Sequence, residues 1–130
     1  MQLSYVVAVI AATVIISLSD WLFFGFLFHA RYQETPEVWR GGPEGPKIVA
    51  STLSALVGCI AFFVIAARLQ LSGMGSALML ALLLWLAGSL PQTFTSTLFL
   101  KYAPAIGVSH SIGWLARALI VGAAYGIVAR

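Results

Sequence analysis

The chain has 130 residues, of which 61% are hydrophobic and 8% are charged. Soluble domains are about 45–50% apolar and about 25% charged, so this composition excludes a water-soluble monomer and indicates a protein that contacts the lipid bilayer. The net charge of +3 comes from 7 Lys and Arg against 4 Asp and Glu, with no basic run. Nothing in this balance predicts a nucleic-acid partner.

Four apolar stretches follow one another along the chain. Crossing the hydrocarbon core of a bilayer, roughly 30 Å, takes about 20 mostly apolar residues. The stretches that meet this length are residues 3–28, 48–67, 76–100 and 108–128. Because the connections are too short to hold a soluble domain, the sequence predicts an all-α fold. Residues 1–130 are expected to form one integral membrane domain, a four-helix antiparallel bundle.

The segment between the first two stretches, residues 29–47, is expected to be a loop. It is polar and contains Pro36, Gly41-Gly42-Pro43 and Gly45-Pro46. These residues are typical of turns because proline and glycine interrupt regular helix.

Two charges and one amide lie inside the apolar stretches. Asp20 lies nine residues before His29 and Gln92 nine residues before Lys101, the first residues after their stretches. Arg117 lies nine residues after Val108, so all three are expected about 13 Å from the same side. A charge at the centre of a span costs about 2.5–3.5 kcal/mol, which favours an ion pair between Asp20 and Arg117. Two alternatives stay open: Arg117 extends to the interface, or Asp20 is protonated.

Further polar side chains recur at helical spacing on the same faces. They predict an intramembrane polar cluster around a wet or hydrogen-bonded cavity that opens toward the first and third connections. Its members are Ser17, Asp20, Ser54, Gln92, Thr93, Ser96 and Arg117. A structural pair that fixes the register of the helices is favoured over a transport relay.

Pro91 lies within the third stretch and predicts a kink there. Proline lacks an N–H, and its ring clashes with the carbonyl four residues earlier. A structural kink is favoured over a hinge or a ligand site.

Small residues at four-residue spacing predict close helix packing. Gly122 and Gly126 form a GxxxG pattern on the fourth stretch, and Gly58 continues a similar row on the second. Such faces let helices approach closely, within one chain or between copies.

No constellation of residues predicts catalysis. His29 and His110 are expected at the ends of spans, as polar interfacial residues rather than ligands of a haem. Cys59 lies in an apolar stretch and is expected to be inert. The sequence therefore predicts a protein that is not an enzyme and that has no metal and no cofactor.

The order of features resembles a family of small bacterial inner-membrane proteins known only as a domain of unknown function. The resemblance rests on Trp21 to Phe28, Trp39, Leu83 to Gly88, and Gly113-Trp114-Leu115. It implies a multi-pass, four-helix protein of the bacterial inner membrane, with no established activity and no catalytic residue.

Two functions remain in view. The first is a non-enzymatic structural or accessory component of a homo-oligomer or a larger membrane complex. The alternative is a small transporter or channel with a path lined by Asp20, Gln92 and Arg117. A closed core around these residues favours the first function, and an open cavity that reaches Asp20 favours the second.

Overall fold

The computed structural model describes residues 2–34 and 36–129, and the regular structure in them is helical throughout. In this part of the chain, 4 helical segments are long and apolar enough to cross a membrane. They are Leu3–Leu27, Glu44–Arg68, Gly73–Phe99 and Pro104–Val128. The predicted helical class is confirmed, and each segment overlaps one of the predicted stretches.

The first segment consists of α1, Leu3–Asp20, and a π-helical turn, η1, Trp21–Leu27. In a π-helix each N–H donates to the carbonyl five residues earlier, so the turn is wider than an α-helical one. The N–H of Phe28 closes η1 by donating to the carbonyl of Phe23 over 3.0 Å. Residues 21–27 contain no proline, and nothing in their spacing predicts this turn.

The segment expected to be a loop contains helix at both ends. After η1 come the short helix α2, His29–Gln33, and a 3₁₀ turn, η2, Pro36–Val38. The second long helix, α3, then runs over Glu44–Arg68. Its first turn accommodates Pro46 because the N–H that proline lacks would have no partner in the helix there.

The third segment is divided by a second π-helical turn just before Pro91. It consists of α4, Gly73–Leu84; η3, Trp85–Ser89; and α5, Leu90–Phe99. The N–H of Leu90 donates to the carbonyl of Trp85, five residues earlier. This wider turn relieves the clash between the proline ring and the carbonyl of the preceding turn. The disturbance expected at Pro91 therefore takes the form of a π-helical turn.

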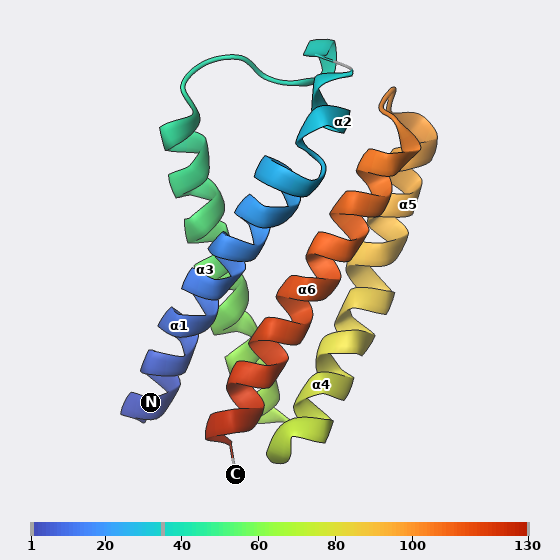
Figure 1. Ribbon diagram of the computed structural model, residues 1–130. Helices are drawn as coiled ribbons and strands as arrows, with labels where there is room; N and C mark the ends of the chain where they lie inside the picture. The colour runs from blue at the N-terminus through green and yellow to red at the C-terminus, as the bar shows by residue number, and fades with distance from the viewer. Residues whose placement is uncertain (1, 35, 130) are drawn as a thin grey trace.

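The last helix, α6, Pro104–Val128, lies at the centre of the arrangement. It packs against α1, α4 and α5, whereas α3 packs mainly against α1. In Figure 1, both termini lie at one end of the molecule and α2 lies at the other. Helix α3 and the α4–α5 segment are thus held apart by α1 and α6.

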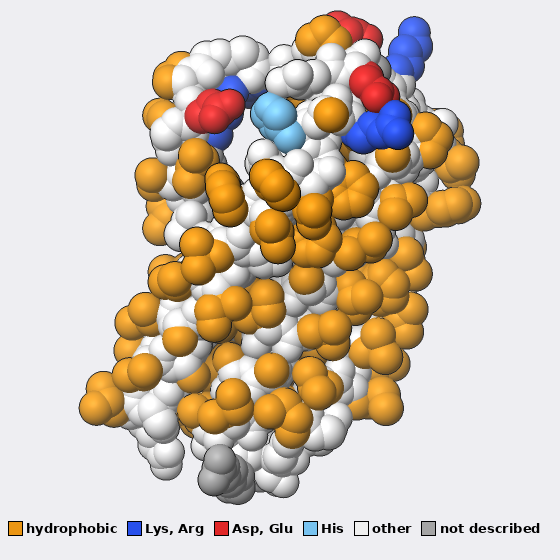
Figure 2. Space-filling view, in the orientation of Figure 1, with side chains coloured by type: hydrophobic (Ala, Val, Ile, Leu, Met, Phe, Trp, Pro, Cys, Tyr) orange, Lys and Arg blue, Asp and Glu red, His pale blue; other side chains and the backbone are white. Residues whose placement is uncertain are grey.

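The surface divides into apolar and charged parts along the helices. In Figure 2, apolar side chains cover most of the visible face, and the charged side chains gather at the end that carries α2. Exposed apolar side chains occur on every long helix, among them Ile10, Val57, Met79 and Ile127, each more than half exposed. This distribution is typical of a surface that contacts lipid tails.

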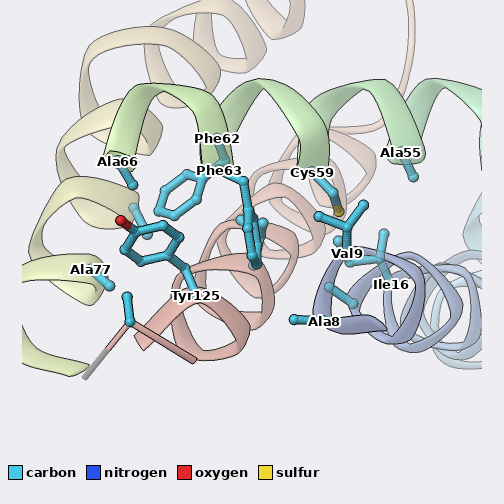
Figure 3. Close-up of a cluster of buried hydrophobic side chains, with 14 residues drawn as sticks. Ala8, Val9, Ile16, Ala55, Cys59, Phe62, Phe63, Ala66, Ala77 and Tyr125 are labelled. Carbon is cyan, nitrogen blue, oxygen red and sulfur yellow. The ribbon is translucent and has the colours of Figure 1, made fainter. Parts of the chain in front are cut away.

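The buried core lies in the half of the molecule nearest the termini, where aromatic rings of α3 and α6 meet (Figure 3) and Tyr5 of α1 packs beside them. The ring of Phe63 lies edge-on to that of Tyr125 at 5.2 Å, and Tyr5 stacks on Tyr125 at 5.9 Å. The hydroxyl of Tyr125 donates to the carbonyl of Leu71 over 3.1 Å. The rings and this hydrogen bond join α1, α3 and α6 to the turn before α4.

Two of the three glycines expected to pack helices do so. A Cβ on Gly122 would lie 2.9 Å from the Cβ of Ala81, and one on Gly126 would lie 2.7 Å from the Cα of Met74. Both positions therefore require glycine for the contact between α6 and α4. Gly58 makes no such contact within the chain: nothing lies within 4 Å of its Cβ position, because this part of α3 borders a groove, and packing of Gly58 against another copy stays a prediction.

Candidate functional site

Asp20 and Arg117 form an ion pair that joins the first and last helices. Arg117 Nε donates to Asp20 Oδ1 over 2.7 Å, and Arg117 Nη2 donates to Asp20 Oδ2. The side chains are 16% exposed for Arg117 and 15% for Asp20. This bidentate arrangement matches the planar guanidinium to the two carboxylate oxygens. Of the alternatives left open by the sequence, an Arg117 side chain extended to the interface does not describe this geometry.

Each partner of the ion pair is positioned by its own helix, and Arg117 is also positioned by a tryptophan. Asp20 is the last residue of α1, directly before the wider turn η1. Arg117 lies near the middle of α6, and its guanidinium carbon lies 4.6 Å from the centre of the Trp114 ring. A cation over an indole face is held by the quadrupole of the ring. The carboxylate and the indole together fix the direction of the guanidinium.

A groove of about 410 Å³ runs beside this pair, between α3 and the α4–η3 segment, with α6 at its base. Arg117, Trp85 and Trp114 lie in its lining, together with the hydroxyl-bearing Ser54 and Ser89; the other lining residues are apolar or small. The indole N–H of Trp85 donates to the carbonyl of Ser111 over 3.0 Å and holds η3 against α6. The groove is thus lined mainly by apolar residues and has one charged residue, Arg117, in its wall.

The remaining members of the predicted polar cluster do not gather around the pair. The hydroxyl of Ser17 donates to the carbonyl of Thr13 over 3.0 Å and lies 3.3 Å from that of Thr52, where it links α1 to α3. The hydroxyl of Thr93 donates to the carbonyl of Ser89 over 2.9 Å, within its own helix. Ser96 is half-buried on α5.

Gln92 departs furthest from the prediction. Its side chain is exposed, and within the described residues no hydrogen bond joins it to Asp20, to Arg117 or to another group. The physical reason is the side of α5 that packs. Thr97, which lies against Gly107 of α6, follows Gln92 by five residues and is therefore about 140° around the helix from it. The polar spacing identifies a stripe on α5 but not the side that faces α6.

A second cluster, at the end that carries α2, escapes the sequence analysis. The rings of Phe24 and His110 lie 5.1 Å apart, those of Tyr32 and Trp39 lie 4.7 Å apart, and Tyr32 lies 5.9 Å from His110. The Tyr32 hydroxyl lies 3.4 Å from that of Ser109. The cluster joins η1, α2, the first connection and α6. The four rings share no helical spacing, so the only available signal is the density of aromatic residues near the first connection.

Burial raises the pKa of the Tyr32 phenol above its ordinary value of 10. The hydrogen bond to Ser109 acts in the opposite direction, and the nearby Tyr102 adds to the increase. Burial dominates because it penalises the charged phenolate. Tyr32 is therefore neutral at physiological pH and serves as a packing and hydrogen-bonding group.

The interactions that the structure shows at the site are packing, hydrogen bonding and charge pairing. Among residues 2–34 and 36–129, no group of three or more His, Cys, Asp or Glu side chains is placed to hold a metal ion. The thiol of Cys59 is buried in the core. A comparison with models of known protein families gives no match, and neither does a search of curated proteins or of solved structures.

Proposed function

We propose that the chain is a multi-pass membrane protein whose long helices cross the bilayer as an antiparallel bundle. We propose further that it is a non-enzymatic structural or accessory component of a membrane assembly. The exposed apolar side chains on all the long helices and the charged end seen in Figure 2 support the membrane location. The proposed membrane is the bacterial inner membrane, on the resemblance of Trp21 to Phe28 and Gly113-Trp114-Leu115 to the small family named above.

The closed geometry of the Asp20–Arg117 pair carries the proposal of a structural role. Both charges are matched within the protein, and both side chains are largely buried. Between the pair and the termini, the space is filled by apolar residues such as Ile16, Val121 and Phe62. A transport relay needs charged side chains that are exposed to water one after another. A buried, bidentate ion pair instead fixes the position of α1 against α6.

One observation favours transport as a second candidate. Arg117 borders the groove between α3 and η3, where Ser54 and Ser89 add hydroxyls. A transport path along this groove would still have to pass the layer of Phe62, Phe63 and Tyr125 that closes the end nearest the termini. For this reason transport ranks below the structural role.

Cysteine accessibility in reconstituted vesicles separates the two functions. The background is Cys59→Ala, and the probe is a charged, membrane-impermeant thiol reagent applied to each side in turn. Ser54→Cys reports on the groove, Val121→Cys on the core below the pair, and Gly41→Cys in the first connection is the exposed control. A structural protein leaves Ser54→Cys and Val121→Cys unlabelled from both sides, because lipid tails and apolar side chains exclude the reagent. Labelling of Val121→Cys from both sides at a rate comparable to the control would refute the proposal.

A further inference from the structure

Gln92 is a strongly polar side chain on an outward face of a candidate membrane span. It lies seven residues before the end of the segment Gly73–Phe99, about 10 Å along the helix. Its side chain is exposed and has no hydrogen-bond partner in the part of the chain that the structure describes. A primary amide has two donor hydrogens and a carbonyl acceptor, and lipid tails satisfy none of them. An unpaired amide at this depth costs free energy, so a partner from outside the chain is expected.

The residues around Gln92 form a continuous exposed face. Thr95 and Phe99 follow it at the third and seventh positions along α5, and both are exposed. This is the spacing of a helix–helix seam. A different side of α5 packs against α6, where Thr97 lies against Gly107. We call the exposed side, Gln92, Thr95 and Phe99, the Gln92 face.

Gly88, in η3, extends the Gln92 face by one turn. It is exposed, and nothing lies within 4 Å of the position where its Cβ would be. The backbone is therefore open to close approach at this point. A partner helix can come near enough to reach the amide of Gln92.

We propose that a second copy of this chain packs against the Gln92 face across a two-fold axis, with the two Gln92 amides hydrogen-bonded to each other. This inference rests on the proposed membrane location and structural role. A second copy is the occupant that the chemistry favours, because an amide carries both donors and an acceptor and is therefore its own complement. In a two-fold interface the same residue meets itself near the axis, so one Gln92 supplies what the other lacks.

Another groove on the surface shows by contrast what lipid tails alone can cover. It has a volume of about 680 Å³ and lies between α1 and α6. Its lining is almost entirely Ala, Ile, Val and Leu, with Ser4 near the N-terminus. Lipid tails satisfy such a surface completely. The Gln92 face differs because it presents an amide that hydrocarbon leaves unpaired.

Disulfide crosslinking in vesicles at low protein-to-lipid ratio tests the dimer. In a Cys59→Ala background, Thr95→Cys places a thiol on the Gln92 face and leaves Gln92 in place. The matched control is Phe94→Cys, which is at the same depth on α5, is 63% exposed in the wild-type chain, and points away from this face. We expect rapid dimer formation with Thr95→Cys and only slow, collisional crosslinking with Phe94→Cys.

The role of the amide is then measured by adding Gln92→Leu or Gln92→Asn to Thr95→Cys. Hydrogen bonds between membrane helices have modest net strength, so Gln92→Leu should weaken dimerisation by about 3- to 30-fold, read as a shift in the protein-to-lipid ratio at half-maximal crosslinking. Gln92→Asn should retain part of the affinity. Size-exclusion chromatography and circular dichroism verify that each variant folds.

The outcomes separate this inference from the proposed function. Equal crosslinking of Thr95→Cys and Phe94→Cys, or no shift with Gln92→Leu, would overturn the Gln92 dimer while the structural role stands. Assembly through a different face in native membranes would likewise overturn the Gln92 dimer while the structural role stands. Labelling of Val121→Cys from both sides overturns the structural role independently, because that assay does not depend on dimerisation.

Discussion

Replacing Arg117 alone should destabilise the protein far more than replacing Arg117 and Asp20 together. Arg117→Met leaves the Asp20 carboxylate without a partner in a site where the side chains are only 16% and 15% exposed. Removing one member of a buried pair typically costs about 3–5 kcal/mol. The geometry gives a similar figure, because two charge-assisted hydrogen bonds are lost and each contributes about 1.5–3 kcal/mol.

The double variant, Asp20→Leu with Arg117→Met, removes both charges and should be close to wild type in stability. An apolar pair of similar volume avoids the desolvation of two ions, which offsets the attraction that is lost. Because each single variant is expected to cost about 3–5 kcal/mol and the double variant little, the double-mutant cycle should give a coupling free energy of about 6–10 kcal/mol. Arg117→Lys keeps the charge but loses the bidentate hydrogen bonding of the guanidinium. The stability of this variant should lie between those of wild type and Arg117→Met.

The assay is equilibrium unfolding in mixed micelles with a rising fraction of denaturing detergent, followed by circular dichroism. Leu119→Met on α6, 39% exposed in the wild-type chain, is the control and should change the free energy of unfolding by less than about 0.5 kcal/mol. Interchanging the charges, with Asp20→Arg and Arg117→Asp, should recover part of the stability lost in either single variant. The reasoning would be refuted if the double apolar variant were no more stable than Arg117→Met.

Three further outcomes are expected. Gly126→Ala should cost about 1–3 kcal/mol in the same unfolding assay because its Cβ would meet the α4 backbone, whereas Gly58→Ala, with open space around it, should be neutral or stabilising by up to about 1 kcal/mol. Tyr125→Phe should cost about 0.5–1.5 kcal/mol because it removes the hydrogen bond to the part-buried carbonyl of Leu71; an unchanged midpoint would contradict this. Because the pKa of Tyr32 is raised in the folded state, its phenolate absorbance, measured as wild type minus Tyr32→Phe, should have its titration midpoint above pH 10. The unfolded chain loses that proton first, so stability falls as the pH rises past 10, and a Tyr32 midpoint at or below pH 10 would contradict the assignment.

The predictions that depend on composition and length hold well in this chain. The long helices follow from apolar stretches, because crossing a bilayer requires a minimum length and leaves few alternatives. The Asp20–Arg117 pair follows from the same reasoning, since isolated charges at one depth are stabilised by each other. The length of an apolar stretch and the position of a charge within it can both be read directly from the sequence.

The predictions that depend on which way a side chain points hold less well. The face of Gln92 is misassigned because the spacing of polar residues identifies a stripe but not which side of the helix meets a neighbour, and α6 contacts the side of α5 that carries Thr97. Gly58 has the spacing of a packing residue but borders an open groove within this chain, and its contact with another copy stays a prediction. The cluster of Phe24, Tyr32 and His110 brings together residues far apart in the chain, and no local spacing encodes such a meeting.

The ion pair also has a consequence for biosynthesis. Asp20 and Arg117 are separated by 97 positions, and chains are made at about 5–20 residues per second, so Asp20 waits about 5–20 s for its partner. For the membrane location proposed above, the first helix carries during that interval a carboxyl group that lacks its Arg117 partner, which favours holding it near the insertion machinery rather than releasing it into lipid. The final helix, which contacts α1, α4 and α5, then completes the whole assembly in one late step. Truncation of the last quarter of the chain should consequently leave nascent products that are recognised and degraded as incomplete.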